Sequence, residues 1–156
     1  MKKTSSDRSL FLRIVLLLYC LAMLYLLFFR SIDGTNGLSY GEQLRANSNL
    51  IPFYTIRNYL YVIIHKSNPA LIQHGLVNLL GNVVLFVPAG ILLPLNFFKQ
   101  HRFFRFFLTW TGIILAVETL QLFTLLGSFD VDDIILNLTG MLLGYVLWAI
   151  FLRKHL

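Results

Sequence analysis

Residues 127–145, GSFDVDDIILNLTGMLLGY, place three carboxylates directly before an apolar run that is long enough to cross a membrane. The carboxylates are Asp130, Asp132 and Asp133, and Asn137 follows Asp133 by one helical turn. Acidic side chains at the edge of hydrocarbon are costly, so by default they mark a functional site. The stretch therefore predicts a membrane-spanning helix with a polar site at its start.

The composition of the whole chain is typical of an integral membrane protein. Its 156 residues are 57% hydrophobic and 13% charged, whereas a soluble domain is about 25% charged. A chain of this length has too little interior to bury so many apolar side chains. We expect a single all-α membrane domain over residues 1–156. Cys20 is the single cysteine, so no internal disulfide can form.

Four apolar runs have at least the roughly 20 residues that a helix needs to cross about 30 Å of hydrocarbon. They cover residues 10–29, 75–98, 103–126 and 131–152. We expect the first run to be retained, because it is too long and leucine-rich for a signal-peptide core and no cleavage site follows it. Pro88 and Pro94 each remove a backbone donor from the second run, so kinks or a break are expected there.

The positions of the basic residues predict that both termini are cytoplasmic. In that orientation the inner pieces carry Lys2, Lys3, Arg8, Arg13, Lys99, Arg102, Arg105, Arg153 and Lys154. The outer pieces carry only Arg30, Arg45, Arg57 and Lys66. The net charge of +6 is therefore read as a topology signal, and no nucleic-acid partner is expected.

The predicted outer segment, residues 30–74, has two parts. Residues 31–49 are rich in Gly, Ser and Asn and read as a loop. Residues 50–64, LIPFYTIRNYLYVII, carry apolar and aromatic side chains at helical spacing, but the run is too short to span a bilayer. Because tyrosine favours the headgroup level, we expect an interfacial or partly re-entrant helix on the outer face.

Six polar side chains within the last three spans share one depth, roughly 3–12 Å below the outer ends of their helices. They are Asn78, Asn82, Glu118, Gln121, Asp133 and Asn137. The cytoplasmic halves of the same spans hold almost no polar side chains. Together with Asp132, these residues predict a small acidic and amide-lined pocket that opens to the outside.

Structural alternatives stand beside this prediction. The three aspartates can cap the last helix and complement its dipole, and the asparagines can hydrogen-bond between helices without any ligand. A carboxyl as deep as Glu118 must be paired or protonated, with Gln121, Asn82 or Arg57 as candidate partners. Gly140 and Gly144 resemble a dimerisation motif, although we expect them to pack within the chain.

The residues of the predicted pocket suit more than one kind of chemistry. Carboxylate oxygens of Asp132, Asp133 and Glu118 suit a divalent cation, which would be the one cofactor. Glu118 and Asp133 are the candidates for acid–base catalysis. The same groups could instead bind hydroxyls or amides of a ligand. Sequence patterns of serine hydrolases, zinc proteases and phosphate-binding loops are absent from the chain.

Four segments follow one another in order between residues 49 and 145. They are NLIPF from Asn49, NLLGNVVLFVPAGILLP from Asn78, ETLQL from Glu118 and FDVDDIILNLTGMLLGY from Phe129. In this order and spacing they resemble the VanZ-like family of small bacterial membrane proteins. The resemblance implies four helical spans in the plasma membrane, typically of Gram-positive bacteria, and a link to low-level resistance to teicoplanin, a lipid-bearing glycopeptide antibiotic.

Members of that family often carry a basic residue just before the FDVDD segment. This chain has Gly127 and Ser128 there, so Arg57 is the candidate to replace that charge.

Three functions are compatible with the sequence. The first is an accessory envelope protein whose pocket binds a lipid-linked or cell-wall component and reduces the access of lipoglycopeptides. The second is an enzyme that acts on a lipid or wall precursor through Glu118 or Asp133. The third is an ion- or proton-coupled transporter that uses Glu118, which ranks last because the cytoplasmic half lacks a polar relay. The expected partners are membrane lipids and a lipid-linked or cell-wall component.

Overall fold

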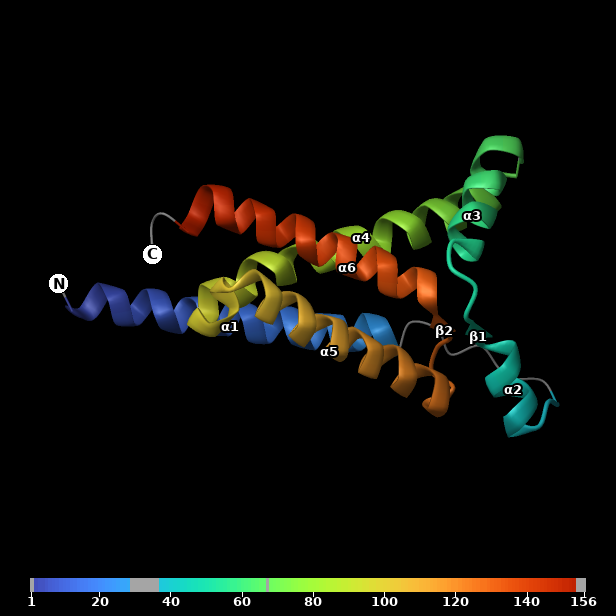
Figure 1. The fold of residues 1–156 in the computed structure, drawn as a ribbon, viewed down its shortest axis with the longest axis horizontal. Coiled ribbons are helices and arrows are strands. Elements are labelled where there is room, and N and C mark those ends of the chain that lie inside the picture. Colours follow the sequence, from blue (N-terminus) through green and yellow to red (C-terminus); the bar gives the residue numbers. More distant parts are fainter. Residues whose placement is uncertain (1, 29–36, 67, 154–156) are drawn as a thin grey trace.

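The computed structural model describes residues 2–28, 37–66 and 68–153, and these residues are almost entirely helical. The long helices are α1 (Lys2–Phe28), α4 (Pro69–Asn96), α5 (Phe103–Thr124) and α6 (Val131–Leu147). They lie along one another in a single bundle, with the start of α1 and the end of α6 at the same end (Figure 1). Each contributes a stretch that is long and apolar enough to cross a membrane, so the predicted all-α class is confirmed and the structure has four candidate spans among the described residues.

Shorter elements close the two ends of the bundle. They are α2 (Tyr40–Ala46), β1 (Ser48–Asn49), α3 (Tyr54–His65), the 3-10 helix η1 (Phe98–His101), β2 (Phe129–Asp130) and the π-helix η2 (Trp148–Leu152). Figure 1 places α2, α3, β1 and β2 together at one end, which we call the loop end. The opposite end, where η1 connects α4 to α5, is called the turn end. The helices α4 and α6 start at the loop end, whereas α1 and α5 finish there.

The second span begins earlier than predicted because a local signal starts α4 at Pro69. The side chain of Asn68 accepts a hydrogen bond from the backbone of Ala70 at 3.0 Å, and proline is well suited to the first helical position. The helix then continues to Asn96 through Pro88 and Pro94, so the alternative of a break is wrong. Membrane helices tolerate proline where neighbouring groups satisfy the carbonyls that it frees.

The pair formed by α4 and α6 is the centre of the fold, and the two helices run parallel. A Cβ on Gly140 would collide with the carbonyl oxygen of Val83, and one on Gly144 would collide with that of Val87. Small residues of this kind let two helix backbones approach closely in a membrane. The Gly140–Gly144 face is therefore occupied within the chain, as expected.

Large aromatic side chains form the core at the turn end. Trp148 and Phe106 are fully buried, and the ring centroids of Phe106 and Tyr145 are 4.6 Å apart. The hydroxyl of Tyr145 donates to the carbonyl of His101 at 2.8 Å, so the polar tip of this ring is satisfied. Aromatic packing thus stabilises the turn end, while the polar side chains gather nearer the loop end.

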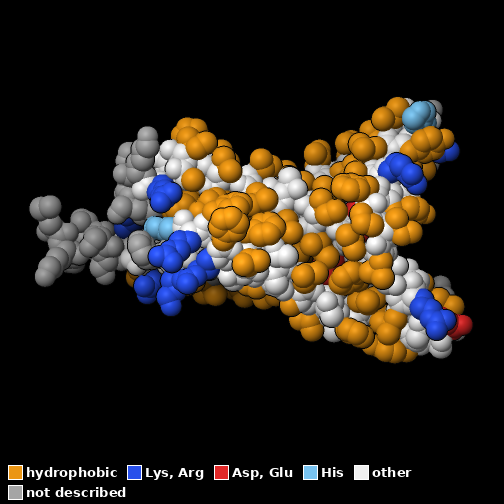
Figure 2. All heavy atoms as spheres, in the orientation of Figure 1, with side chains coloured by type: hydrophobic (Ala, Val, Ile, Leu, Met, Phe, Trp, Pro, Cys, Tyr) orange, Lys and Arg blue, Asp and Glu red, His pale blue; other side chains and the backbone are white. Residues whose placement is uncertain are grey.

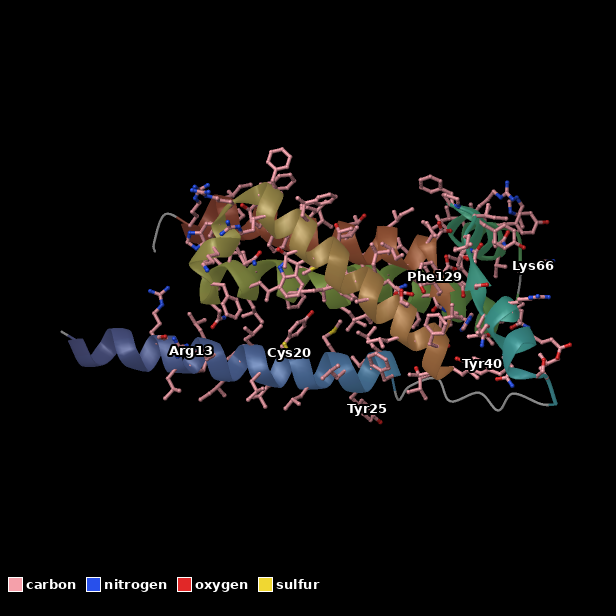
Figure 3. All side chains as sticks on the ribbon, turned by 60° about the horizontal axis from the view of Figure 1, so that its bottom comes forward. Arg13, Cys20, Tyr25, Tyr40, Lys66 and Phe129 are labelled. Atoms are coloured by element: carbon pink, nitrogen blue, oxygen red, sulfur yellow. The ribbon has the colours of Figure 1, made fainter. Side chains whose placement is uncertain are left out.

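α1 is the most weakly packed of the long helices. Only 6% of its apolar window is buried, and its main contact is with α4. Hydrogen bonds nevertheless fix it along its length, since the Tyr19 hydroxyl donates to the carbonyl of Leu85 and the amide of Asn96 donates to that of Leu12. Figure 3 shows Cys20 of α1 directed toward the other helices and Tyr25 directed away from them.

The molecular surface has the pattern of a membrane protein. Figure 2 shows apolar side chains along the length of the bundle and Lys and Arg side chains gathered at its two ends. In the same view one acidic side chain is visible at the tip of the loop end, and only small parts of the others show between the helices.

Residues 30–74, the predicted outer segment, contain more structure than predicted. Residues 31–49 were expected to form a loop, yet α2 begins after Ser39, and residues 31–36 lie outside the described part. The backbone and hydroxyl of Ser39 donate to the carboxylate of Glu42 at 2.9 and 2.6 Å, and these hydrogen bonds hold the pKa of Glu42 below its ordinary value. The predicted helix over residues 50–64 corresponds to α3, whose position relative to a membrane stays a prediction.

Candidate functional site

The three aspartates at the start of α6 each serve a different element. Asp130 caps α6 itself, because its carboxylate accepts the backbone N–H of Asp132 at 2.8 Å. It also accepts the hydroxyl of Thr55 at 2.6 Å and the amide of Asn49 at 3.2 Å. The capping alternative is therefore confirmed for Asp130, which in addition ties α3 and β1 to the start of α6.

Asp132 caps a helix other than its own. Its buried carboxylate accepts the backbone N–H of Phe53 at 2.5 Å and that of Ile56 at 3.0 Å, at the start of α3. Phe53 stands at the N-cap of α3 with φ at 64° and offers no capping side chain. A carboxylate at a helix N-terminus gains both charge-assisted hydrogen bonds and the favourable helix dipole. Asp132 therefore has a structural role in which both of its oxygens are used.

Asp133 connects α6 to α4. It accepts the side-chain amide of Asn82 at 2.5 Å and is half-buried. Tyr59 of α3 lies near it: burial raises the pKa of the Tyr59 phenol, and the negative charges of Asp133 and Asp130 raise it further. The predicted proximity of Asn82 and Asp133 is thus present in the structure.

Two of the predicted pocket residues make contacts elsewhere. The amide of Asn78 donates to the carbonyl of His74 at 2.9 Å, one turn earlier in α4. The amide of Gln121 donates to the carbonyl of Leu27 at 2.7 Å and so ties α5 to the end of α1. These bonds keep the two amides apart from the aspartates.

Glu118 and Asn137 form a buried polar pair and are 3% and 2% exposed. The amide of Asn137 lies 3.4 Å from Oε1 of Glu118 and donates to it. The candidate partners Gln121, Asn82 and Arg57 are not the ones that Glu118 uses. Arg57 is exposed and forms no ion pair with an acid in the described part of the chain, so it does not supply the charge missing before the FDVDD segment.

One oxygen of each member of this pair is left unused. Glu118 Oε2 and Asn137 Oδ1 are buried and form no hydrogen bond of ordinary geometry, although the backbone N–H of Asp130 lies close enough to the Glu118 carboxylate to interact with it. Buried polar atoms are nearly always satisfied, so two neighbouring exceptions call for an explanation such as a ligand or a water molecule.

Both residues line a cavity of about 250 Å³ between α1, α4, α5 and α6. The rest of its wall is almost entirely apolar and is formed by Leu16, Tyr19, Cys20, Met23, Leu24, Leu27, Phe86, Ala89, Leu93, Trp110, Ile113, Ile114, Val117 and Met141. The other five predicted pocket residues do not line this cavity. The site is thus an apolar chamber with a polar end, and whether it binds a ligand stays a prediction.

The three carboxylates of the suggested cation site are not grouped in the structure. Among the described residues, no group of three or more acidic, histidine or cysteine side chains is arranged to hold a metal ion. Both oxygens of Asp132 accept hydrogen bonds from the start of α3, so this carboxylate is held apart from Glu118. Glu118 faces the cavity, whereas Asp133 is paired with Asn82 outside it, so the two candidate catalytic acids stand in different surroundings.

Comparison with known proteins agrees with the resemblance seen in the sequence. The VanZ/LLP1 family model matches residues 16–152. This chain belongs to the VanZ family. It is 28% identical over 142 residues to "Protein VanZ" from Enterococcus faecium. The matched region is 91% of this chain and 75% of that relative. No solved structure matches this member of the VanZ family.

Sequence reasoning missed the contribution of two regions of this VanZ-family chain. Asn49 and Thr55 hold Asp130, and the NLIPF segment that contains Asn49 was a signal for this role. Side chains of α1 form one wall of the cavity, but α1 has no polar residue at the depth of Glu118 that would have revealed it.

Proposed function

We propose that this protein is a plasma-membrane protein of the cell envelope that lowers susceptibility to teicoplanin-type lipoglycopeptides. It acts by binding or altering a component of the outer leaflet or the cell surface, through the cavity that Glu118 and Asn137 close at one end. Membership of the VanZ family supports the antibiotic context.

The single observation that carries a binding role is the pair of unused oxygens in an apolar chamber. Glu118 Oε2 and Asn137 Oδ1 are buried, neighbouring and without a hydrogen bond of ordinary geometry, and both residues line the same cavity. An apolar pocket with a few converging polar groups is the usual form of a small-molecule site. A purely structural pair would be expected to satisfy both atoms, because each unpaired buried group costs about 1–3 kcal/mol.

The proposed orientation places the loop end outside the cell. The turn end carries Lys99, Arg102, Arg105 and Arg153, whereas the described part of the loop end carries Arg45, Arg57 and Lys66. With the basic turn end in the cytoplasm, Glu118 lies about 9 Å below the outer end of α5, at the level of the outer leaflet.

The test is expression of wild type and Glu118→Gln in a teicoplanin-susceptible Gram-positive host. Wild type is expected to raise the minimum inhibitory concentration of teicoplanin and to reduce the binding of a fluorescent teicoplanin to the cell surface. Glu118→Gln keeps the size of the side chain but replaces the carboxylate, so it is expected to lose both effects at equal protein abundance.

Thr119→Val is the matched control, because Thr119 is the next residue of α5 and donates only to the carbonyl of Leu115 in its own helix. It should behave as wild type. Teicoplanin without its acyl chain provides a second control, since its activity should not respond to the protein. Unchanged susceptibility and unchanged surface binding with wild-type protein would rule the proposal out.

A further inference from the structure

The cavity has a direction that its lining residues define. Glu118 and Asn137 are each six residues from the loop-end terminus of their helices, so both lie about 9 Å below that end. Trp110 precedes Glu118 by eight residues in α5 and therefore lines the cavity about 12 Å nearer the turn end. The two unused acceptor oxygens lie at the end of the chamber that faces the loop end. The part toward the middle of the bundle is apolar apart from Trp110, whose buried indole N–H also has no partner.

The polarity of the cavity matches that of a lipid in the outer leaflet. In the proposed orientation, a lipid of the outer leaflet also has its polar group toward the loop end and its hydrocarbon toward the midplane. The cavity volume of about 250 Å³ lies just below the roughly 300–1,000 Å³ of most small-molecule pockets, which favours a single chain over a two-chain lipid.

The two unused atoms specify what the head of that chain must provide. Glu118 Oε2 and Asn137 Oδ1 are both oxygens that accept hydrogen bonds, and the amide nitrogen of Asn137 is already directed to Glu118. An incoming group that donates hydrogen bonds, such as a hydroxyl or an amine, would satisfy them. An ester or ether oxygen would leave both acceptors unpaired.

The wall formed by α1 provides a route of entry from the bilayer. α1 packs chiefly on α4, and the cavity is partly open, with the exposed side chains of Cys20 and Leu24 on its α1 side. Figure 3 shows Cys20 directed from α1 toward the remaining helices. A chain could therefore enter from the membrane beside α1 without passing the loops.

We propose that this cavity binds the single hydrocarbon chain of an outer-leaflet amphiphile and that Glu118 and Asn137 accept hydrogen bonds from the hydroxyl or amine at the head of that chain. The inference rests on the proposed function, because it names the class of component that the same site would take.

Cys20 is the natural reporter for this inference, since it lines the cavity and is the single cysteine of the chain. Wild-type protein is reconstituted in phosphatidylcholine nanodiscs, whose headgroup has no hydrogen-bond donor, and Cys20 is alkylated with N-ethylmaleimide. Dodecanol and dodecylamine are then compared with dodecyl methyl ether and dodecane. When dodecanol or dodecylamine is present at about ten times its Kd, it is expected to slow the alkylation of Cys20 about tenfold by mass action.

Equal protection by all four probes would overturn the assignment of Glu118 and Asn137 as acceptors, and protection by none would overturn the site itself. Glu118→Leu is expected to weaken dodecanol binding about tenfold, as the loss of one hydrogen bond implies. Ala89→Phe should fill the cavity and abolish the response. Val84→Phe is its matched control, because Val84 lies on the same helix but is exposed and does not line the cavity.

The hydrocarbon chain of the antibiotic is a competing occupant, and teicoplanin with and without its acyl chain is the arm that separates the two. Protection of Cys20 by the acylated drug but not by dodecanol would overturn the proposed amphiphile. These measurements use purified protein and are independent of susceptibility. An altered susceptibility in Glu118→Gln cells with no protection of Cys20 would therefore reject this inference while leaving the proposed function in place.

Discussion

At the scale of single residues, adjacent side chains of like charge have separate partners. Asp132 and Asp133 follow one another, yet one caps α3 and the other holds α4 through Asn82. No basic side chain of the described residues pairs with either of them, so backbone N–H groups and amides carry the stabilisation. Because helix N-termini favour negative charge, this arrangement can hold acids together without cations.

Asp132→Asn is expected to destabilise the outer segment by about 2 kcal/mol, because the charge-assisted hydrogen bonds to Phe53 and Ile56 are lost. The measurement is limited proteolysis within α3 together with thermal unfolding in detergent. Asp133→Asn is the control, since its remaining carbonyl oxygen can still accept from Asn82. Equal protease sensitivity of the two variants would contradict the capping role.

A second prediction at this scale concerns Glu42, which is fully exposed. The hydroxyl of Ser39 is the main cause that lowers the pKa of Glu42 below 4.5, so Ser39→Ala should raise it toward that value. The pKa is lower in the folded state. The contribution to the stability of α2 is therefore complete above pH 4.5 and is lost as pH falls through the folded pKa. Titration of the Glu42 carboxyl by NMR measures the change, and an identical midpoint in the variant would exclude the hydrogen bond.

At the scale of elements, the α4–α6 contact has no space for a Cβ. Gly140→Ala or Gly144→Ala would push a methyl group into a backbone carbonyl of α4, which cannot move aside as a flexible side chain can. We expect a loss of about 3 kcal/mol or more, at the upper end for overpacked sites. Thermal unfolding of the purified protein is the measurement.

Gly81→Ala is the matched control for that prediction. It lies in α4, and a Cβ there would meet no atom within 4 Å, so the change should be neutral or stabilise the helix by up to about 1 kcal/mol. A destabilisation as large as that of Gly140→Ala would contradict the prediction, because Gly81 has no close backbone neighbour and so close approach could not be the cause of either loss.

The sequence was sufficient to predict the long helices and the segregation of polar groups, because hydropathy and depth along a helix are local properties. It was not sufficient to assign partners. Whether the oxygens of Asp132 turn to a cavity or to α3 depends on where α3 starts, and that start requires φ at 64° at Phe53. The α1 wall of the cavity was missed for a similar reason, since an apolar helix facing lipid and one facing a chamber have the same composition.

At the scale of the whole molecule, the orientation can be tested with cysteines introduced after Cys20→Ala. Gly41→Cys at the loop end should react with a membrane-impermeant maleimide in intact cells. Phe97→Cys, which is 51% exposed at the turn end, should react only after permeabilisation. The basic side chains of the turn end are the physical reason for this orientation. The reverse pattern of labelling would invert the proposed topology and place the polar pair in the inner leaflet.

The cap that Asp132 provides for α3 also has a consequence for the order in which the protein can mature. The ribosome makes α3 long before α6, since the two bonded positions Phe53 and Asp132 are 79 residues apart. Until the last helix is inserted, the start of α3 lacks its cap, and β1 lacks β2 as its partner strand. A nascent chain arrested before Phe129 should therefore present an outer segment that proteases can still cut, so completion of the final span would act as the last step that protects the whole protein.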